Sequence, residues 1–564
     1  MLRKHQQETL NIVDGIIAGS GVTKIVLHAV PGSGKSLIPI IAGKLITAGL
    51  ADALAWITPR KTLQEQGERG FIDPVFRQML GHDLVIRTST NDKNPCRGVN
   101  GFATTYQAVA MDEKSILQDE FSRWRYILIL DEFHHVEAGG VWHQALQPLV
   151  EQAAYMVLMT GTLERGDEKP IAFIPYQATP VGLIPVIDQD PDAKLITYTR
   201  EVALMERAIL PLHFVLNDGD VEWEKDGETF SGKLSKTFKD AGAAIWTAMS
   251  TGFADELLKM GLDHWQEYRL QHPRAKALIV VANISQAKRT LSGLKGMGLN
   301  AEIATSSDHD GAVKAIRKFK GPECDILVSV AMVYEGFDEP QATHIICLTH
   351  IRSTSWIEQM VARVVRIDPH AGPYEAQMGY VFAPDDFLMR RIISRIKTAQ
   401  LAFAHAREKR DPQDLQQGEA PPDGSGGTNP YGITPIGSKL TGQREYRMGG
   451  DDSPAPTYQE PWPQEEVKTQ SEIEKELRDE IENHLRKFAF TNYYLMQRIN
   501  REVKDAFEGK PRAEMTVPEL QKVLSHVRNY YPMERTAPDP WHKRRGAGRR
   551  VPAKAMEWNQ LSMF

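Results

Sequence analysis

The sequence has few cysteines, no long apolar run and no large excess of one charge. Its cysteines, Cys96, Cys324 and Cys347, lie far apart and form no Cys-x-x-Cys pair. This spacing argues against a disulfide framework and a cysteine-based zinc site, and suits a reducing compartment. The start, MLRKHQQETL, lacks the apolar core of a signal peptide, and no apolar run approaches the roughly 18–20 residues that span a bilayer. We therefore expect a soluble, intracellular protein with no membrane partner.

The chain also lacks a global basic field. Its formal net charge is −6 over 564 residues, so any nucleic acid must be held by a local cleft or patch. The composition, 41% hydrophobic and 25% charged, is that of an ordinary globular protein. A chain of this length exceeds one hydrophobic core, and about three or four domains are expected.

Short apolar runs alternate with amphipathic segments through the first 400 residues. The runs are rich in β-branched residues and almost continuously apolar, which is typical of strands buried on both faces of a parallel sheet. Helical patterns such as Lys35–Ala48 and Ser285–Lys295 lie between them, so βαβ units and two α/β lobes, 1–205 and 206–404, are predicted. The predicted strands are Lys24–Val30, Leu54–Thr58, Tyr126–Leu130, Met156–Thr160, Ala277–Val281, Ile326–Val330 and His344–Leu348.

The last third of the chain differs in composition. Residues 405–470 are rich in Pro, Gly, Ser and Asp, which predicts a flexible linker. Helical pattern resumes in 471–535, where Thr516 and Glu519 have the spacing of a capping box, and a small helical domain is predicted. The tail 536–564 contains KRRGAGRRVPAK, with six basic residues and no acid, which either contacts phosphates or is simply solvated.

The first chemical signal is AVPGSGKSL at 29–37, between an apolar strand and a helical pattern. This is the context of a phosphate-binding loop. Gly32 and Gly34 let the backbone of the loop turn its N–H groups toward a triphosphate. The Lys35 ammonium would reach the β- and γ-phosphates, and the Ser36 hydroxyl would bind Mg²⁺. The residues that would wrap the phosphates are Pro31, Gly32, Ser33, Gly34, Lys35 and Ser36.

The second signal is ILILDEFHH at 127–135. A nucleotide hydrolase needs a carboxylate for Mg²⁺ and a base for the attacking water, and Asp131 and Glu132 are placed to supply them. A zinc site on His134 and His135 is the rival interpretation, but adjacent side chains diverge and neither has a partner at zinc spacing. The third interpretation is a polar strand end that takes no part in catalysis. Elsewhere, DGDVEWEK at 218–225 has faintly nuclease-like acidic spacing, but a surface hairpin is the better interpretation.

The ordered motifs resemble those of helicase superfamily 2, in its DExH branch, which includes the helicase subunits of type I and type III restriction enzymes. The segments that carry the resemblance cover about residues 1–400 in the family's order. They are LRKHQQE, AVPGSGKS, TPRKTLQEQ, TTYQAV, DEFHH, MTGTLER, ILVSVAMVYEGFDEP and WIEQMVARVVR. Two positions depart from the family pattern: Ala29 stands where motif I has its first glycine, and Ala362 stands where motif VI has glycine.

The resemblance implies a role for each matching residue. Arg3 and Gln6 would bind the nucleotide, with Gln6 reading adenine, and Gly336 and Asp338 would touch nucleotide and ribose. Nucleic-acid contacts would come from Thr58, Arg60, Thr105, Gln107 and Ser329. His134, Thr160 and Thr162 would couple the ATP state to the nucleic-acid cleft, and Gln359, Arg363 and Arg366 would act on the γ-phosphate. His135 has no implied role.

The implied protein is an ATP- and Mg²⁺-dependent helicase or translocase with two RecA-like lobes. Its expected partner is nucleic acid, with DNA preferred, in the cytoplasm of a bacterial or phage-infected cell. An RNA helicase, or a nucleic-acid-stimulated ATPase switch that does not unwind, stays open as an alternative. The helical C-terminal domain would be an accessory module that binds nucleic acid or a protein partner.

Overall fold

The computed structural model describes residues 2–532, except residues 91, 113–114, 164–168, 180–181, 306, 331–337, 399–430, 449–467 and 493. Two compact units divide the chain: residues 1–91 and 99–467 form one, and residues 92–98 with 468–564 form the other. Within the described residues, we find no helix with the length and apolar character needed to cross a membrane.

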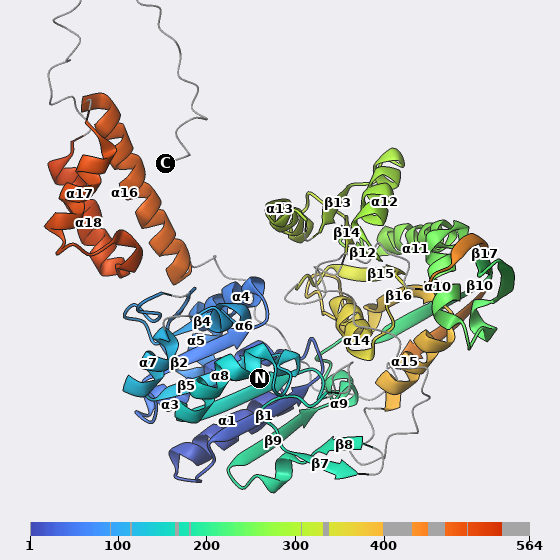
Figure 1. Cartoon of the computed structure of the whole chain (residues 1–564), viewed down its shortest axis with the longest axis horizontal. Coiled ribbons are helices and arrows are strands. Elements are labelled where there is room, and N and C mark those ends of the chain that lie inside the picture. The colour runs from blue at the N-terminus through green and yellow to red at the C-terminus, as the bar shows by residue number, and fades with distance from the viewer. Residues whose placement is uncertain are drawn as a thin grey trace, which may run out of the picture. The chain divides into compact units, whose positions relative to one another are not determined.

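A seven-stranded sheet forms the core of the first lobe (Figure 1). Its order is β3-β4-β2-β5-β6-β1-β9, and every neighbouring pair is parallel. The central strands are fully buried because they are covered on both faces, as their continuous apolar runs predict. The strands are β1 (Lys24–Ala29), β2 (Ala53–Thr58), β3 (Ile86–Thr88), β4 (Gly101–Thr105), β5 (Tyr126–Asp131), β6 (Tyr155–Thr160) and β9 (Ala193–Tyr198).

Helices connect most of these strands, whereas a loop joins β3 to β4. The predicted helix Lys35–Ala48 is instead divided into a 3₁₀ turn, η1 (Lys35–Leu37), and two short helices that meet at Gly43. A Cβ at Gly43 would lie 2.7 Å from Leu84 Cδ1 and 3.0 Å from Ile40 O, so the chain is closely packed at this residue. The helices of the lobe are α1 (Lys4–Ile17), α2 (Ile38–Ala42), α3 (Lys44–Thr47), α4 (Lys61–Ile72), α5 (Pro74–Leu80), α6 (Tyr106–Ala110), α7 (Ile116–Arg123), α8 (Val141–Gln152) and α9 (Arg200–Met205), and a small hairpin pairs β7 (Tyr176–Thr179) with β8 (Gly182–Pro185).

An eight-stranded sheet forms the second lobe, with the order β11-β10-β16-β15-β12-β14-β13 and β17 paired to β10. The run from β13 to β10 is parallel, while β11 and β17 pair antiparallel with β10. The strands are β10 (Leu212–Lys225), β11 (Glu228–Lys233), β12 (Lys276–Val281), β13 (Ala301–Ala304), β14 (Ile326–Ser329), β15 (Ala342–Leu348), β16 (Gly379–Pro384) and β17 (Thr434–Met448). The helices are α10 (Ala241–Ser250), α11 (Gly252–Gln271), α12 (Ile284–Gly296), α13 (His309–Lys320), α14 (Thr354–Val361) and α15 (Phe387–Thr398). The predicted parallel-sheet lobes are confirmed.

The segment DGDVEWEK forms the end of β10 in the β10–β11 hairpin, as predicted. Part of the predicted linker 405–470 is wrong, however, because residues 434–448 are the strand β17. This strand pairs with β10 along almost all of its length, from Leu212 to Glu224, with two register shifts. The long edge of β10 offers backbone partners to β17, and these hydrogen bonds order a segment whose local composition is only weakly strand-like. The other linker residues, 405–430 and 449–467, lie outside the described residues.

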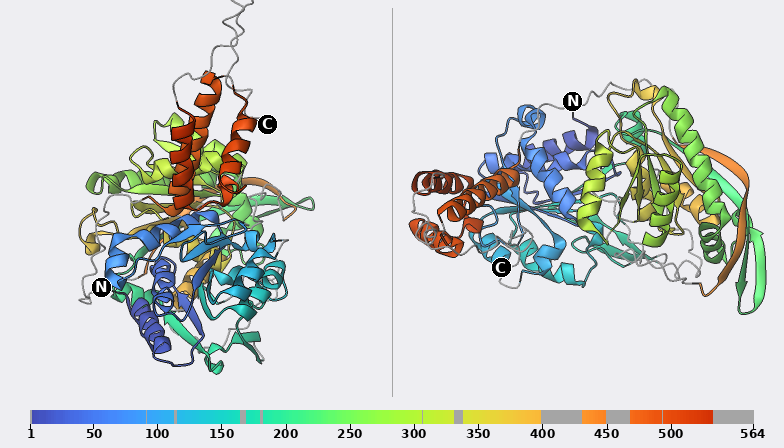
Figure 2. Two further views of the ribbon diagram at one scale, coloured as in Figure 1. Left: turned by 90° about the vertical axis from the view of Figure 1, so that its left-hand side faces the viewer. Right: turned by 90° about the horizontal axis from the view of Figure 1, so that it is seen from above.

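The second unit contains three helices lying side by side, drawn in red in Figures 1 and 2: α16 (Gln470–Asn492), α17 (Met496–Ala506) and α18 (Val517–Tyr530). Their apolar faces share one core that includes Ile481, Leu485, Ile499 and Leu520. The predicted capping box is present at α18: Thr516 accepts a hydrogen bond from Glu519 N, and the Glu519 carboxylate accepts one from Thr516 N. The predicted helical C-terminal part is confirmed.

The loop 92–98 belongs to the helical unit, although it stands between β3 and β4 in the chain. Arg97 is buried, and its guanidinium forms ion pairs with Glu474 (2.9 Å) and Asp92 (2.7 Å). At the exposed rim, Lys93 pairs with Glu514 at 3.1 Å. A loop of the first lobe's sequence is therefore an integral part of the helical unit.

Candidate functional site

The loop after β1 has the geometry expected of an anion cradle. Gly32 and Gly34 have φ angles of +94° and +80°, in the left-handed region that favours glycine. A Cβ at Gly34 would lie 2.9 Å from Arg3 Nη1 and 3.0 Å from Gln6 Nε2. The Ser33 hydroxyl is buried and has no hydrogen-bond partner. The loop is thus wrapped closely by neighbouring side chains and retains an unsatisfied donor.

The first turn of α1 fixes this loop. The Gln6 amide donates to Gly34 O at 3.1 Å, and its oxygen accepts from Arg3 N at 2.9 Å. The Arg3 guanidinium makes a long contact of 3.5 Å with Gly32 O. Both ends of the Gln6 amide are therefore used to hold backbone, and its implied adenine contact stays a prediction.

Two carboxylates meet the loop at the end of β5. The Glu132 carboxylate accepts hydrogen bonds from Lys35 Nζ at 2.5 Å and from Gly161 N at 3.1 Å. Glu132 has a φ of +47°, a left-handed conformation that a non-glycine residue adopts at a cost of about 1–3 kcal/mol. Asp131 is buried beside it, and its carbonyl accepts a hydrogen bond from the Tyr106 hydroxyl at 2.8 Å. The surroundings hold Glu132 in a strained, fixed orientation.

The environment separates the pKa values of the two acids. Burial, with the nearby charge of Glu132, raises the pKa of Asp131 to about 7. Burial alone would also raise the pKa of Glu132, but the Lys35 ammonium and His134 outweigh it and hold that pKa well below its usual value. Glu132 is therefore the ionised member of the pair, and a cation beside Asp131 would favour ionisation of both.

His134 connects Glu132 to β6. Its Nδ1 lies 2.8 Å from Thr160 Oγ1 and 3.4 Å from the Glu132 carboxylate. The Thr160 hydroxyl donates to Thr162 O at 2.7 Å, so His134 Nδ1 is the donor in the contact with Thr160. The three residues implied to couple the site are brought into one hydrogen-bonded chain. The ring of His135 lies 4.1 Å from that of His134.

The second lobe brings Arg366 to the phosphate-binding loop. A Cβ built on Gly32 would collide with the Arg366 guanidinium and would lie 3.2 Å from Val365 Cγ2. Arg366 also pairs with Asp338 at 2.7 Å. Desolvation would raise the pKa of Asp338, but the charges of Arg366 and Arg363 outweigh it and lower that pKa. The structure thus joins two segments that are more than 300 residues apart in the chain.

Gln359 and Arg363 lie in α14 and in the 3₁₀ turn η5 (Ala362–Val364) that follows it, and both are largely buried. The Gln359 carbonyl oxygen has no hydrogen-bond partner. Ala362 is completely buried, so this position requires a small side chain. Gly336 lies outside the described residues.

The implied nucleic-acid contacts divide into exposed and buried residues. Gln107 is exposed, and Thr105 caps α6 by accepting a hydrogen bond from Ala108 N at 3.2 Å. Thr58 is fully buried and donates to Arg60 O at 3.0 Å at the start of α4, and its implied nucleic-acid contact stays a prediction. Ser329 is also buried, at the end of β14, and its hydroxyl has no hydrogen-bond partner.

Sequence reasoning missed three residues around the loop. Two of them are His5 and Tyr198: His5 is fully buried, its ring lies 4.1 Å from that of Tyr198, and burial with the charges of Arg3 and Lys35 lowers its pKa to about 3. The third is Tyr106, whose hydroxyl holds Asp131 O. His5 lies within the motif LRKHQQE, and Tyr106 lies within TTYQAV. An aromatic ring inside each motif could therefore have indicated these two residues from the sequence.

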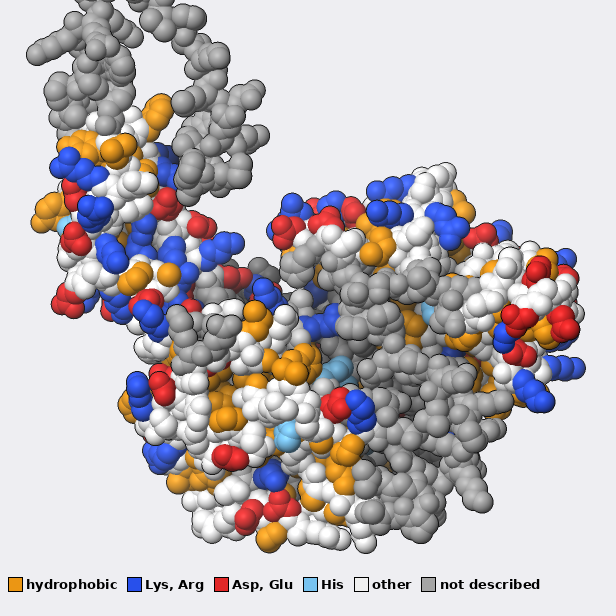
Figure 3. Space-filling view, in the orientation of Figure 1, with side chains coloured by type: hydrophobic (Ala, Val, Ile, Leu, Met, Phe, Trp, Pro, Cys, Tyr) orange, Lys and Arg blue, Asp and Glu red, His pale blue; other side chains and the backbone are white. Residues whose placement is uncertain are grey.

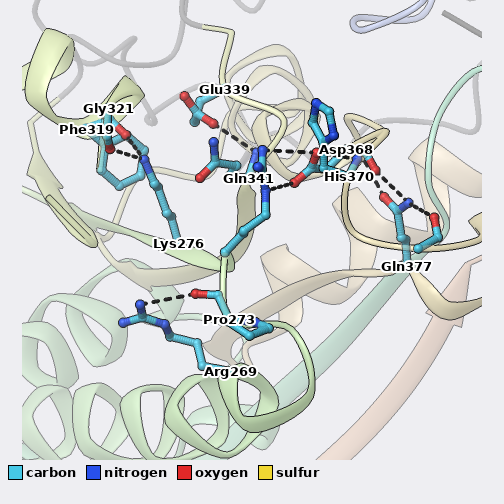
Figure 4. A network of polar contacts seen from close by, with 12 residues as sticks. Arg269, Pro273, Lys276, Phe319, Gly321, Glu339, Gln341, Asp368, His370 and Gln377 are labelled. Carbon is cyan, nitrogen blue, oxygen red and sulfur yellow. Dashed lines mark hydrogen bonds and ion pairs between the residues drawn. The ribbon is translucent and has the colours of Figure 1, made fainter. Parts of the chain in front are cut away.

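A separate polar network lies in the second lobe (Figure 4). Lys276 is buried and donates to the carbonyls of Phe319 and Gly321 at the end of α13. Nearby, Gln377 and Arg274 both bind Asp368, beside a cavity of about 230 Å³. This network is at the amino-terminal ends of β12 and β15, at the opposite edge of the sheet from Ser329. It holds the loop after Arg366 in place.

Two family models match the chain. Residues 1–165 match the model for the type III restriction enzyme, res subunit, and residues 257–368 match the helicase conserved C-terminal domain. An uncharacterized protein of Mycobacterium leprae (strain TN) is 24% identical over 378 residues, 66% of this chain and 60% of the relative. One of Mycobacterium tuberculosis (H37Rv) is 24% identical over 60% of this chain and 55% of its own length. The chain spans somewhat more than half the length of these curated relatives.

The fold also resembles solved structures. The Mycobacterium smegmatis helicase Lhr, bound to ssDNA and AMP-PNP, is 14% identical, with a TM-score of 0.45 over 71% of this chain and 48% of Lhr. The ATP-dependent type ISP restriction-modification enzyme LlaBIII, bound to DNA, is 13% identical, with a TM-score of 0.43 over 68% of this chain and 27% of LlaBIII.

Proposed function

Since this chain carries the lobes of a superfamily 2 helicase related to the type I and type III restriction enzymes, as its motifs predicted, we propose that it is an ATP-driven DNA helicase or translocase. The observation that supports this best is the contact chain from Lys35 through Glu132 and His134 to Thr160, with Arg366 at Gly32. A structural lobe without catalysis has no need of a strained, buried glutamate paired with the loop lysine.

The residues fit ATP as substrate. The loop backbone and the Ser33 hydroxyl would bind phosphate oxygens, and Lys35 would leave Glu132 for the β- and γ-phosphates. Magnesium, when bound, would neutralise phosphate charge, held by Ser36 and Asp131. Two protein ligands suffice because substrate phosphates and water complete the magnesium shell, and no group of three or more candidate ligand side chains occurs among the described residues.

Release of Lys35 frees Glu132 to act as base. Its carboxylate, oriented by Gly161 N and His134, would accept a proton from the attacking water. Arg366 would stabilise the negative charge that spreads over the transferring phosphoryl group, with Arg363 beside it. Because Arg366 belongs to the second lobe, hydrolysis depends on closure of the two lobes.

The coupling route runs through the same residues. Since His134 contacts both Glu132 and Thr160, a change at the carboxylate is transmitted to β6 and Thr162. The start of α4 with Arg60, and the start of α6 with Thr105 and Gln107, would form the nucleic-acid track. Alternate grip by the two lobes would then move the protein along one strand.

The test is ATP hydrolysis by the full chain with single-stranded DNA, duplex DNA and RNA as separate activators, followed by strand displacement. We expect stimulation by DNA and displacement of an annealed strand. Stimulation by RNA alone would favour an RNA helicase, and stimulation without displacement a translocase or an ATPase switch. Hydrolysis that responds to none of these nucleic acids would contradict the proposal.

A further inference from the structure

The linker 206–211 joins α9 of the first lobe to β10 of the second. Its first residue, Glu206, is held by the first lobe. Lys4 N lies 3.2 Å from both oxygens of the Glu206 carboxylate, and the Tyr198 hydroxyl donates to one of them at 2.6 Å. Burial and the Glu206 carboxylate raise the pKa of Tyr198, so its hydroxyl keeps the proton that it donates.

The Glu206 carboxylate caps α1 from outside that helix. Lys4 is the first residue of α1, and its N–H is one of the donors that a helix start leaves without an intrahelical partner. A negative charge is unfavourable at the end of α9 but favourable at the start of α1, whose first turn contains no acidic residue. The same turn of α1 carries Arg3 and Gln6, which contact carbonyls of the phosphate-binding loop. The position of this carboxylate therefore bears on the loop.

The next residue of the linker is held by the second lobe. Arg207 pairs with Glu375 at 2.8 Å, and its guanidinium lies 5.4 Å from the centre of the Tyr374 ring. Figure 3 shows acidic and basic side chains next to each other at many places on the surface, so an exposed pair alone marks no site. The backbone is more informative, because Arg207 has a left-handed φ of +53°, which persists in a non-glycine residue only when the surroundings hold it.

Two backbone contacts then fix the linker to the second lobe. The Tyr374 hydroxyl donates to Ile209 O at 2.9 Å, and Leu210 N donates to Val365 O at 2.8 Å. Val365 directly precedes Arg366, whose guanidinium lies beside the phosphate-binding loop. The contacts thus close on themselves: the loop contacts α1, α1 contacts the linker, the linker contacts Val365, and Arg366 returns to the loop.

We propose that Glu206 is a positioning residue, which sets the phosphate-binding loop against Arg366 through α1 on one side and the linker on the other. One side chain then acts on two steps: nucleotide binding, through the loop, and turnover, through the approach of the arginine. A carboxylate that only capped a helix would act on stability alone. This inference rests on the proposed ATP hydrolysis and names the residue that sets lobe closure at that site.

The experiment measures the Kd of AMP-PNP and the kcat of ATP hydrolysis by the full chain, with the activating nucleic acid at saturation. Glu206→Ala should raise the Kd and lower kcat, each at least about 5-fold, because hydrogen bonds to a charged group are lost. Tyr374→Phe leaves α1 untouched, so it should lower kcat about 2- to 10-fold and keep the Kd within about 2-fold. Glu201→Ala, which removes an exposed carboxylate from α9, is the matched control and should change neither.

Melting curves check that each variant folds. Glu206→Gln retains an oxygen acceptor and loses the charge, so its Kd should fall between those of wild type and Glu206→Ala. If Glu206→Ala does not fold, an unchanged Kd in Glu206→Gln or an unchanged kcat in Tyr374→Phe overturns the inference.

Two results with folded Glu206→Ala would also overturn it. A lower melting temperature with unchanged Kd and kcat would leave Glu206 only a stabilising role, and a raised Kd with unchanged kcat would remove the linker from turnover. If the wild-type chain neither binds AMP-PNP nor hydrolyses ATP, the proposed function itself fails. If it does both and Glu206→Ala behaves like Glu201→Ala, only this inference fails.

Discussion

At the scale of single residues, the site is defined by how Glu132 is held. Its backbone is left-handed, its carboxylate is bound by Lys35 and Gly161 N, and His134 approaches from a third direction. A carboxylate with three partners cannot rotate, and proton abstraction depends on such fixed geometry. The cost of the strained backbone is met by these contacts and by the buried strand that precedes them.

Glu132→Gln should retain ATP binding and lower the turnover rate by about 10²–10⁴-fold, because the amide keeps the shape and loses the base. The measurement pairs a nucleotide-binding titration with the ATPase rate. Glu151→Gln, at an exposed position of α8, serves as the control and should be neutral. Normal turnover by the Glu132 variant would remove this residue from its role.

His5 makes the first lobe sensitive to acid. Its pKa is about 3 in the folded chain, against an ordinary value of 6.5, so between these values the unfolded chain binds one more proton. Stability is therefore lost as pH falls from about 6.5 toward about 3. His5→Phe keeps the ring on Tyr198 and removes the proton. From pH 7.5 to pH 5, wild type should lose up to about 2 kcal/mol more unfolding free energy than the variant. Denaturant titrations at both pH values measure the unfolding free energy. Equal losses of unfolding free energy in the wild type and in the variant would contradict this prediction.

At the scale of elements, two segments take their structure from distant partners. The strand β17 is ordered by the edge of β10, and the loop 92–98 is ordered by α16. Both pairings satisfy groups that would otherwise be costly: backbone hydrogen bonds in the first case and a buried guanidinium in the second. Neither segment has a strong local preference of its own.

The amide hydrogens of residues 434–448 that pair with β10 should exchange slowly. We expect protection well above that of the exposed turn at Asp226 and Gly227, because each paired N–H must break a ladder hydrogen bond before it exchanges. Hydrogen exchange followed by mass spectrometry of peptides from both regions measures this. Equal, fast exchange would restore the interpretation of this segment as a linker.

Breaking the buried pair of Arg97 and Glu474 should destabilise the helical unit. After Arg97→Met the buried Glu474 keeps Arg478, and after Glu474→Met the buried Arg97 keeps Asp92, so each loss should be at most about 3–5 kcal/mol and should increase exchange in α16. The double variant should recover much of the loss, because no unpaired charge remains between these two positions. If the double variant instead loses as much stability as the two single variants added together, the two residues are not coupled.

At the scale of the whole molecule, Arg366 of the second lobe lies at the loop of the first, and in the proposed function hydrolysis depends on this approach. Its guanidinium occupies the space beside Gly32, and Asp338 holds it there. If the proposed function holds, we expect substitutions that change lobe closure to alter the hydrolysis rate from a distance.

Arg366→Ala should retain ATP binding and lower the turnover rate by roughly 10³–10⁵-fold, the range found for arginine fingers. Arg274→Ala removes an arginine of the same lobe at the remote polar network and should leave turnover within a few fold. Both are compared in the ATPase assay with saturating DNA. A small effect of Arg366→Ala would shift the finger role to Arg363.

The sequence by itself predicted seven of the strands, the loop after the first of them and the pair Asp131–Glu132. These are local features: continuous apolar runs report burial on both faces, and glycines before Lys35 report a turn. The capping box at Thr516 is local in the same sense.

Only the tertiary structure decided which distant groups meet. That Thr160 receives His134, that Arg366 fills the space at Gly32 and that Arg97 is buried against Glu474 depend on the order of strands in each sheet and on the packing of helices. The burial of Thr58 and the pairing of β17 with β10 are decided in the same way. Such contacts leave no periodic trace in the chain, because their free energy comes from partners tens to hundreds of residues away.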